Sequence, residues 1–359
     1  MDRRNFFSMF AYGAFGMCIP AWLASKRADA STDNDLQEPR AIEKGMTDFG
    51  LPKNRICVIA VGHAAVRIVS PFLHADPEIS QFIAIDTDSK RLAQSGANVC
   101  VLLGENQPKP DTPHQARALA VAQRQIILDA VGELDIVIIV AEMSGPLGLG
   151  AAPVVAQFAK SQAFMTIGLA VMPFGFEGRK KSRTANAGVR TLLRHSNAVL
   201  PLSAEVLTHF IPADAPFFAA ANQVQILARQ TFEHLFWMFY FTGSYSVVAH
   251  DLGAMRSWID GHLLAMGWAR VSRPDGLIKA MDEAINHPDI GLGKFQNADF
   301  AQILIHQTMP AQMMVAVVHA IKELNSEGMM DFTLGGQFFE KQENNGAVTI
   351  LTRKSNTHT

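Results

Sequence analysis

The chain has 359 residues, 48% of them hydrophobic and 18% charged, which is enough to bury a large core and excludes a disordered protein. Its formal net charge of −2, with a single short basic cluster at 178–183, gives no indication of a nucleic-acid partner. Three cysteines match neither a zinc-site spacing nor a disulfide framework, so we predict no metal centre.

Residues 1–30 have the features of an export signal or a membrane anchor. Arg3 and Arg4 precede an uncharged stretch over 6–23, and an A-x-A-like cleavage site follows at 28–30. The start resembles a twin-arginine signal, and the uncharged stretch is about long enough to span a bilayer if it is not cut. We therefore expect association with a bacterial inner membrane. The domain is then exported by the twin-arginine route, or cytoplasmic if the segment is an artefact of start-site assignment.

The next segment, 31–54, is polar and contains prolines and glycines, so we interpret it as a linker. Apolar runs then alternate with helical patterns, such as 64–74 and 115–132. The predicted strands are 55–62, 81–88, 133–142, 164–171 and 197–202. This alternation predicts an α/β fold with a doubly wound, mainly parallel sheet that is buried on both faces.

A long, aromatic-rich helix is predicted over about 222–241, between two domains. The remainder contains two predicted helices and three predicted strands, which indicate a smaller α/β C-terminal domain: helices 275–286 and 312–325, strands 301–306, 329–334 and 346–353. The predicted organisation is a nucleotide-binding domain over 55–220, a core helix with the loop that follows it over 221–250, and a C-terminal domain over 251–355.

Ligands bind outside the carboxyl ends of the strands in open parallel sheets. Three loops are predicted there: 62–65, 86–89 and 142–152. In the third, glycines 145, 148 and 150 let backbone amides approach an anion at the start of the next helix. Tight packing between strand and helix explains the same glycines equally well.

Several motifs in order resemble FtsZ of the FtsZ/tubulin superfamily. The best are "FIAIDTDSKRL" (82–92) and the stretch 150–195, which opens with "GAAPV" and contains "PFGFEGRK". The resemblance runs from about Arg55 to Arg353. It implies a GTP-binding domain, a long core helix and a C-terminal domain, with a role in cell division. It also implies that GTP is hydrolysed between the subunits of a filament.

The resemblance implies a set of nucleotide-contacting residues spread over the loops and two helix starts. They are Gly62, His63, Asp86, Thr87, Ser144, Gly145, Gly148, Gly150, Glu177, Lys181 and Asn222. His63 is equally well explained as an exposed loop histidine, and Asn222 as a helix-start asparagine. GTP or GDP is the implied cofactor, and Mg²⁺ is expected only if the protein hydrolyses GTP.

The chain departs from the family pattern where phosphate is bound. Leu147 and Leu149 replace two threonines, and Pro146 removes a backbone N–H. Glu142 and Asp86 place additional carboxylates near the expected triphosphate. Each lost donor costs on the order of 1–3 kcal/mol, so several losses predict GTP binding that is weaker by powers of ten.

The other implied sites are also altered. Lys181 stands where the family has arginine, and 200–203 lacks the asparagine that faces guanine. In the loop 243–252, which corresponds to the catalytic loop, only Asp251 remains of the acidic pair. It either orients the attacking water or caps the following helix.

Three hypotheses follow. The first is an FtsZ-like protein with weak or no GTP hydrolysis, a structural or regulatory element that self-associates or co-assembles with an FtsZ-type partner. It would reach the membrane through its N-terminus, because the chain stops at Thr359 without the family's usual tail. The second is an active, divergent GTPase that uses Glu142, Asp86 and Asp251 with Mg²⁺. The third is a binder of another ligand in a pocket that Leu147 and Leu149 make apolar.

Overall fold

The computed structural model describes residues 54–75, 79–105, 107–211, 216–240, 252–271, 276–291, 295–296, 298, 300–306, 319, 331–336 and 346–353. The predicted signal or anchor, most of the linker, the predicted helix over 312–325 apart from residue 319, and Asp251 lie outside these residues. None of the helices in the described ranges is both long and apolar enough to cross a membrane.

The larger sheet is doubly wound and parallel. Its strands lie in the order β3-β2-β1-β4-β5-β6. Their bounds are β1 Ile56–Val61, β2 Gln81–Asp86, β3 Val99–Leu102, β4 Ile136–Glu142, β5 Met165–Val171 and β6 Ala198–Leu202. The five predicted strands are present, whereas β3 was not predicted. The direction of winding changes between β1 and β4, so the carboxyl ends of these two strands mark the switch point at which such sheets bind ligands.

The central strands are buried on both faces, as their continuous apolar sequences predict. In β1, Ile56, Val58 and Ala60 pack on one side, and Cys57, Ile59 and Val61 on the other. Cys100 lies on the edge strand β3 and is exposed, although its neighbours in the sequence are apolar.

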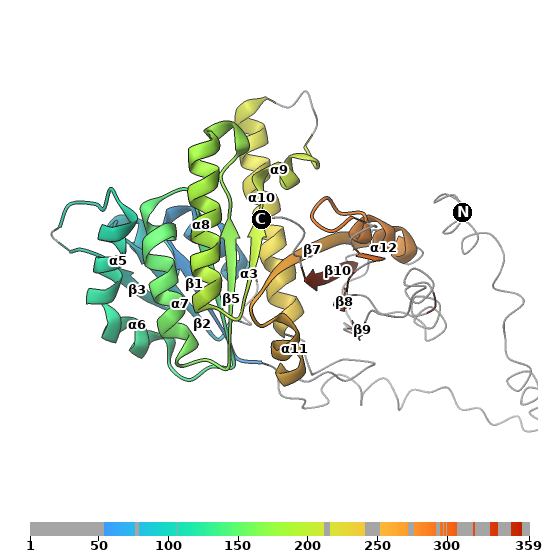
Figure 1. Cartoon of the computed structure of the whole chain (residues 1–359), viewed down its shortest axis with the longest axis horizontal. Coiled ribbons are helices and arrows are strands. Elements are labelled where there is room, and N and C mark those ends of the chain that lie inside the picture. The colour runs from blue at the N-terminus through green and yellow to red at the C-terminus, as the bar shows by residue number, and fades with distance from the viewer. Residues whose placement is uncertain are drawn as a thin grey trace, which may run out of the picture.

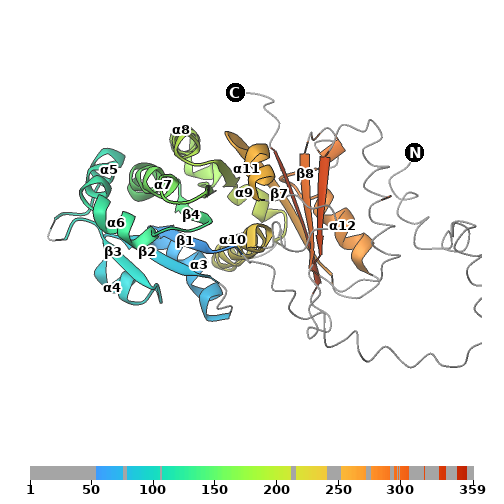
Figure 2. The ribbon, with the colours of Figure 1, turned by 90° about the horizontal axis from the view of Figure 1, so that it is seen from below.

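Two layers of helices cover this sheet (Figure 2). One face carries α5 Pro113–Ala122, α6 Arg124–Val131, α7 Ala152–Lys160 and α8 Arg179–His195. The other carries α3 His63–Ala75, α4 Ser89–Ala93 and α10 Phe217–Tyr240. The single helix predicted over 115–132 is two helices, because the backbone leaves the helical region at Gln123. A capping box between Thr112 and Gln115 starts the first of them.

The second unit is a mixed sheet in the order β7-β10-β8-β9, which β7 joins to β6. Its elements are α11 Leu252–Ile259, β7 His262–Val271, α12 Leu277–Ile285, β8 Phe300–His306, β9 Asp331–Gly336 and β10 Gly346–Arg353. Figure 1 shows α10 between the larger sheet and these strands. Strand β7 was not predicted, although it is the element that makes one continuous sheet.

Helix α10 is the core helix that the sequence predicts. Its aromatic side chains Phe232, Phe236 and Phe239 are fully buried. The ring of Phe72 on α3 meets the ring of Phe232 edge to face at 5.5 Å. These contacts fix α3 against α10 on one face of the sheet.

Candidate functional site

The loops after β1 and β4 meet at the switch point. Gly62 follows β1 directly with φ +88°, a conformation that favours glycine, and its N–H donates to Ile85 O at 2.8 Å. A Cβ on Gly62 would lie 3.7 Å from Cβ and Cδ1 of Leu147. A leucine side chain therefore lies against the first glycine loop.

The loop after β4 is helical rather than open. Pro146 has φ −58° and ψ −39°, and it starts η2, a π-helical turn over Leu147–Ala151 that leads into α7. The N–H of Leu149 donates to Gly145 O at 3.1 Å. That amide is engaged within the turn, while Leu147 and Gly148 occupy first-turn positions whose amides have no partner inside a helix.

Two of the three glycines of this loop are needed for packing. A Cβ on Gly148 would lie 1.8 Å from Glu142 O, and a Cβ on Gly150 would lie 1.9 Å from Pro113 O. Both residues are buried. Gly145 differs, because a Cβ there would have no atom within 4 Å. The packing interpretation therefore accounts for Gly148 and Gly150, and Gly145 faces open space.

The two leucines that replace threonines pack into the protein. A Cβ on Gly188 of α8 would lie 2.5 Å from Cδ2 of Leu149. Leu147 and Leu149 both contact the cluster of buried side chains between the sheet and α5–α8. The hypothesis of an apolar ligand pocket formed by these leucines finds no support in this packing.

Polar side chains beside the loop bond to one another. Ser144 Oγ donates to Glu142 Oε1 at 2.5 Å, and Lys181 Nζ lies 2.5 Å from Glu177 Oε2. The hydrogen bond from Lys181 lowers the pKa of Glu177, and the same bond raises the pKa of Lys181. Glu177 Oε1 also accepts a hydrogen bond from the N–H of Phe174. Phe174 is the N-cap of the short 3₁₀ helix η3 Gly175–Glu177. These groups are already paired before any ligand arrives.

The second loop turns its carboxylates toward its own backbone. Asp86 is only 2% exposed, and its Oδ1 accepts from the N–H groups of Thr87 at 2.6 Å and Asp88 at 3.2 Å. Asp88 caps α4 by accepting from the N–H groups of Lys90 and Arg91. The hydrogen bond from the Arg91 amide is the main cause that lowers the pKa of Asp88. Asp86, which the sequence places near the expected triphosphate, is thus a buried residue bonded to the backbone of its own turn.

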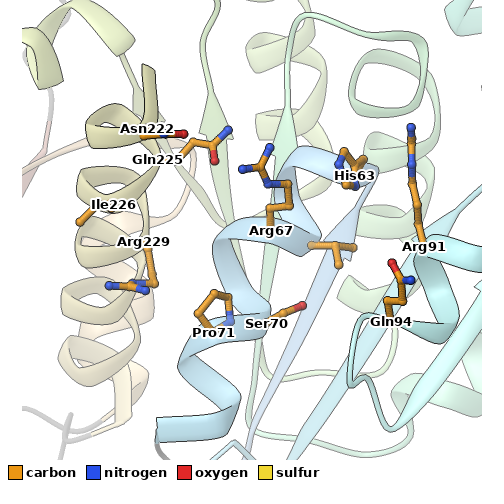
Figure 3. Close-up of a pocket in the computed structure, with 11 residues that line it drawn as sticks. His63, Arg67, Ser70, Pro71, Arg91, Gln94, Asn222, Gln225, Ile226 and Arg229 are labelled. Carbon is orange, nitrogen blue, oxygen red and sulfur yellow. The ribbon is translucent and has the colours of Figure 1, made fainter. Parts of the chain in front are cut away.

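A cavity of about 590 Å³ lies beside these loops, on the outward face of α3 (Figure 3). It is bounded by α3, α4 and α10. The residues that line it are His63, Val66, Arg67, Ser70, Pro71, Arg91, Gln94, Asn222, Gln225, Ile226 and Arg229.

Of the predicted site residues, His63 and Asn222 line this cavity. The other nine described ones lie at the ends of β1 and β2, between β4 and α7, in η3 or on α8. The arginines were missed by sequence reasoning. The signal that identifies two of them is helical spacing, since His63 with Arg67 and Gln225 with Arg229 are each four residues apart. Among the described residues no group of three or more His, Cys, Asp or Glu side chains is placed to hold a metal ion.

The fold and its loops define a doubly wound α/β protein whose ligand edge has the layout of a nucleotide-binding domain. Comparisons with known proteins give the family. The model of the tubulin/FtsZ family GTPase domain matches residues 55–212. These residues belong to the FtsZ/tubulin superfamily, of which they are a divergent example.

Individual relatives agree with this assignment. The cell division protein FtsZ of Azotobacter vinelandii is 27% identical over 237 residues, which is 65% of this chain and 60% of that protein. A solved FtsZ dimer of M. jannaschii superposes with a TM-score of 0.72 at 20% identity, over 89% of this chain and 94% of the other. CetZ2 of Haloferax volcanii, solved as a protofilament with bound GTPγS, gives 0.67 at 17% identity, over 84% and 94%. These structural likenesses show the shared fold.

Proposed function

We propose that this protein is an FtsZ-like structural or regulatory element with a weakened GTP site and weak or no GTP hydrolysis. It self-associates or co-assembles with an FtsZ-type partner at a membrane, in cell division. The observation that carries the proposal is the loop 144–151, which forms a leucine-packed helical turn where the resemblance implies a phosphate cradle.

The donor groups of the site support weak binding. The Ser144 hydroxyl donates to Glu142, and the Lys181 ammonium pairs with Glu177. To bind a phosphate, each must first leave its present partner. Pro146 has no N–H, and Leu147 and Leu149 offer no hydroxyl. With on the order of 1–3 kcal/mol lost per missing donor, these residues fit a triphosphate poorly.

Self-association is supported by the relatives rather than by the site. The M. jannaschii FtsZ was solved as a dimer and CetZ2 as a protofilament, and both share this fold. The match to the A. vinelandii protein covers 60% of its length, so the activity of that whole protein is a proposal here. Assembly that does not depend on GTP turnover fits the paired state of the polar groups at the loops.

Membrane association is proposed for the N-terminal segment. Its motivation is the twin-arginine start followed by the uncharged stretch over 6–23. A C-terminal reporter that is active on only one side of the membrane tests the side on which the domain lies. Reporter activity that is recovered only in the soluble fraction of the cells would contradict membrane association.

An active GTPase is the second candidate. Gly145 faces open space and Gly62 has the left-handed conformation suited to a glycine loop, so part of the phosphate edge is kept. Asp251 would then orient the water in the neighbouring subunit's site. If GTP turnover occurs, Asp251→Ala should abolish it; unchanged turnover would exclude this mechanism.

Calorimetric titration of the full chain with GTP, followed by phosphate release during assembly, tests the first proposal. We expect a Kd weaker than about 100 μM and no turnover above background. A low-micromolar Kd with steady phosphate release would contradict the proposal and favour the active GTPase.

A further inference from the structure

The cavity on α3 is cationic in a protein whose net charge is negative. Four of its eleven lining residues are Arg67, Arg91, Arg229 and His63, and none of the eleven is acidic. We call the surface formed by these eleven lining residues the cationic groove. Arginine clusters of this kind recognise phosphate and carboxylate groups, because the planar guanidinium donates two parallel hydrogen bonds.

The arginines differ in how far they are already paired. Arg91 lies 3.6 Å from Asp88, and Arg229 lies 3.3 Å from Glu233. Arg67 is exposed and has no ion-pair partner within the part of the chain that the structure describes. It extends from α3 toward Gln225 on α10 (Figure 3). Arg67 is therefore the guanidinium that a ligand can engage without breaking an existing pair.

The rest of the groove suits a small organic anion rather than a bare ion. Gln94, Gln225 and Asn222 bring neutral amide groups to its rim. Ile226, which is 40% exposed, and Val66 add apolar surface for a carbon skeleton. A volume of about 590 Å³ is in the range of small-molecule sites.

We propose that the cationic groove binds a free, phosphate-bearing small molecule with at least two anionic oxygens, and that Arg67 is its principal anchor. The groove reaches the first glycine loop at His63 and the start of α10 at Asn222, both of them implied nucleotide contacts, whereas no residue of 142–151 or 174–181 lines it. It does not depend on the proposed function, because neither GTP binding nor assembly enters the argument.

Calorimetric titration of the full chain with inorganic pyrophosphate, and separately with orthophosphate, tests this site. Wild type is expected to bind pyrophosphate saturably and more tightly than orthophosphate. Arg67→Gln should weaken pyrophosphate binding by about tenfold or more, as expected for loss of a charge-assisted pair. The matched control is Arg190→Gln, which removes the same charge from the exposed face of α8 on the far side of the sheet and should bind as wild type does.

A second variant separates the groove from the glycine loop. Gly145→Asp places a carboxylate in open space at the loop, and pyrophosphate binding should survive it. Loss of binding in Gly145→Asp with no effect of Arg67→Gln would assign the anion to the loop and overturn the proposal. If Arg67→Gln and Arg190→Gln weaken pyrophosphate binding equally, the binding reflects overall charge only, and the proposal is also overturned.

Vesicles of phosphatidylglycerol distinguish the source of the phosphate. We expect wild type and Arg67→Gln to sediment with them equally. If Arg67→Gln lowers vesicle binding and wild type shows no saturable binding of pyrophosphate, the groove holds a lipid headgroup, and the assignment to a free small molecule fails.

Discussion

The loop after β4 and the cationic groove lie on the same domain and differ in the state of their polar groups. At the loop, hydroxyl, carboxylate and ammonium groups are paired with one another, and leucines fill the space beside them. In the groove, a guanidinium is left unpaired among neutral amides within the described residues. A shared fold therefore fixes where a ligand edge lies, while the side chains decide whether that edge still offers donors.

The largest expected effect is a steric loss of stability, and it tests whether the loop after β4 is packed against β4 as the structure shows. Gly148→Ala should lower the free energy of unfolding by about 3 kcal/mol or more, because its Cβ would lie 1.8 Å from Glu142 O. Urea denaturation measures it. Gly145→Ala is the control and should change stability by less than about 1 kcal/mol, since its Cβ meets nothing. Equal effects of the two variants would show that the turn is not packed as described.

Loss of stability at low pH limits the pH range in which the loop after β4 and the cavity on α3 can be compared in the folded protein. Burial lowers the pKa of His287 from 6.5 to about 4, while nearby Asp289 raises it and His209 lowers it. As pH falls, His287 is therefore protonated in the unfolded chain before it is protonated in the folded protein. The free energy of unfolding falls as pH drops from about 6.5 to 4, by about 3 kcal/mol in total. Urea midpoints at pH 7 and 5 measure the loss.

The variant His287→Gln isolates this contribution. It removes the titrating group, so the decline between pH 7 and 5 should become shallower than in wild type. An unchanged decline would assign the acid sensitivity to other groups.

Restoring hydroxyls to the loop should bring it closer to a phosphate site. The triple variant Pro146→Gly, Leu147→Thr and Leu149→Thr should bind GTP about tenfold or more tightly than wild type, at some loss of stability from the packing of Leu149. Titration with GTP measures it. The control changes both leucines to alanine, which removes the same packing without adding donors, and should show no gain. A gain in the control would mean that space rather than donors limits binding.

The smallest effect concerns the pair between Lys181 and Glu177. Glu177→Gln should change the free energy of unfolding by less than about 1 kcal/mol, because the pair is exposed and four residues apart on a helix start. The pKa of Glu177 is lowered in the folded protein. The contribution of the pair is therefore present above the ordinary carboxyl pKa and is lost as pH falls through the folded value. Urea titrations at pH 7 and 3 check this; a change of several kcal/mol would show that the pair is not a surface pair.

Most of the larger sheet was predictable because its strands are long apolar runs separated by helical patterns. Strand β3 has only four residues and lies at the edge, so its sequence carries little signal. Strand β7 was missed because it pairs with β6 and β10, which are distant in sequence.

The candidate site was only partly predictable. Sequence patterns located the loops, but not that Leu147–Ala151 continue the helix or that Asp86 turns inward, because both depend on backbone geometry. The cationic groove was missed because its residues come from three helices that only the fold brings together.

The most direct test of the account is a crystal structure of the protein grown with a non-hydrolysable GTP analogue at a concentration on the order of 1 mM. We expect that residues 144–151 keep the turn and that no triphosphate is ordered against it. A fully occupied nucleotide whose phosphate oxygens all accept hydrogen bonds from this loop would contradict the account.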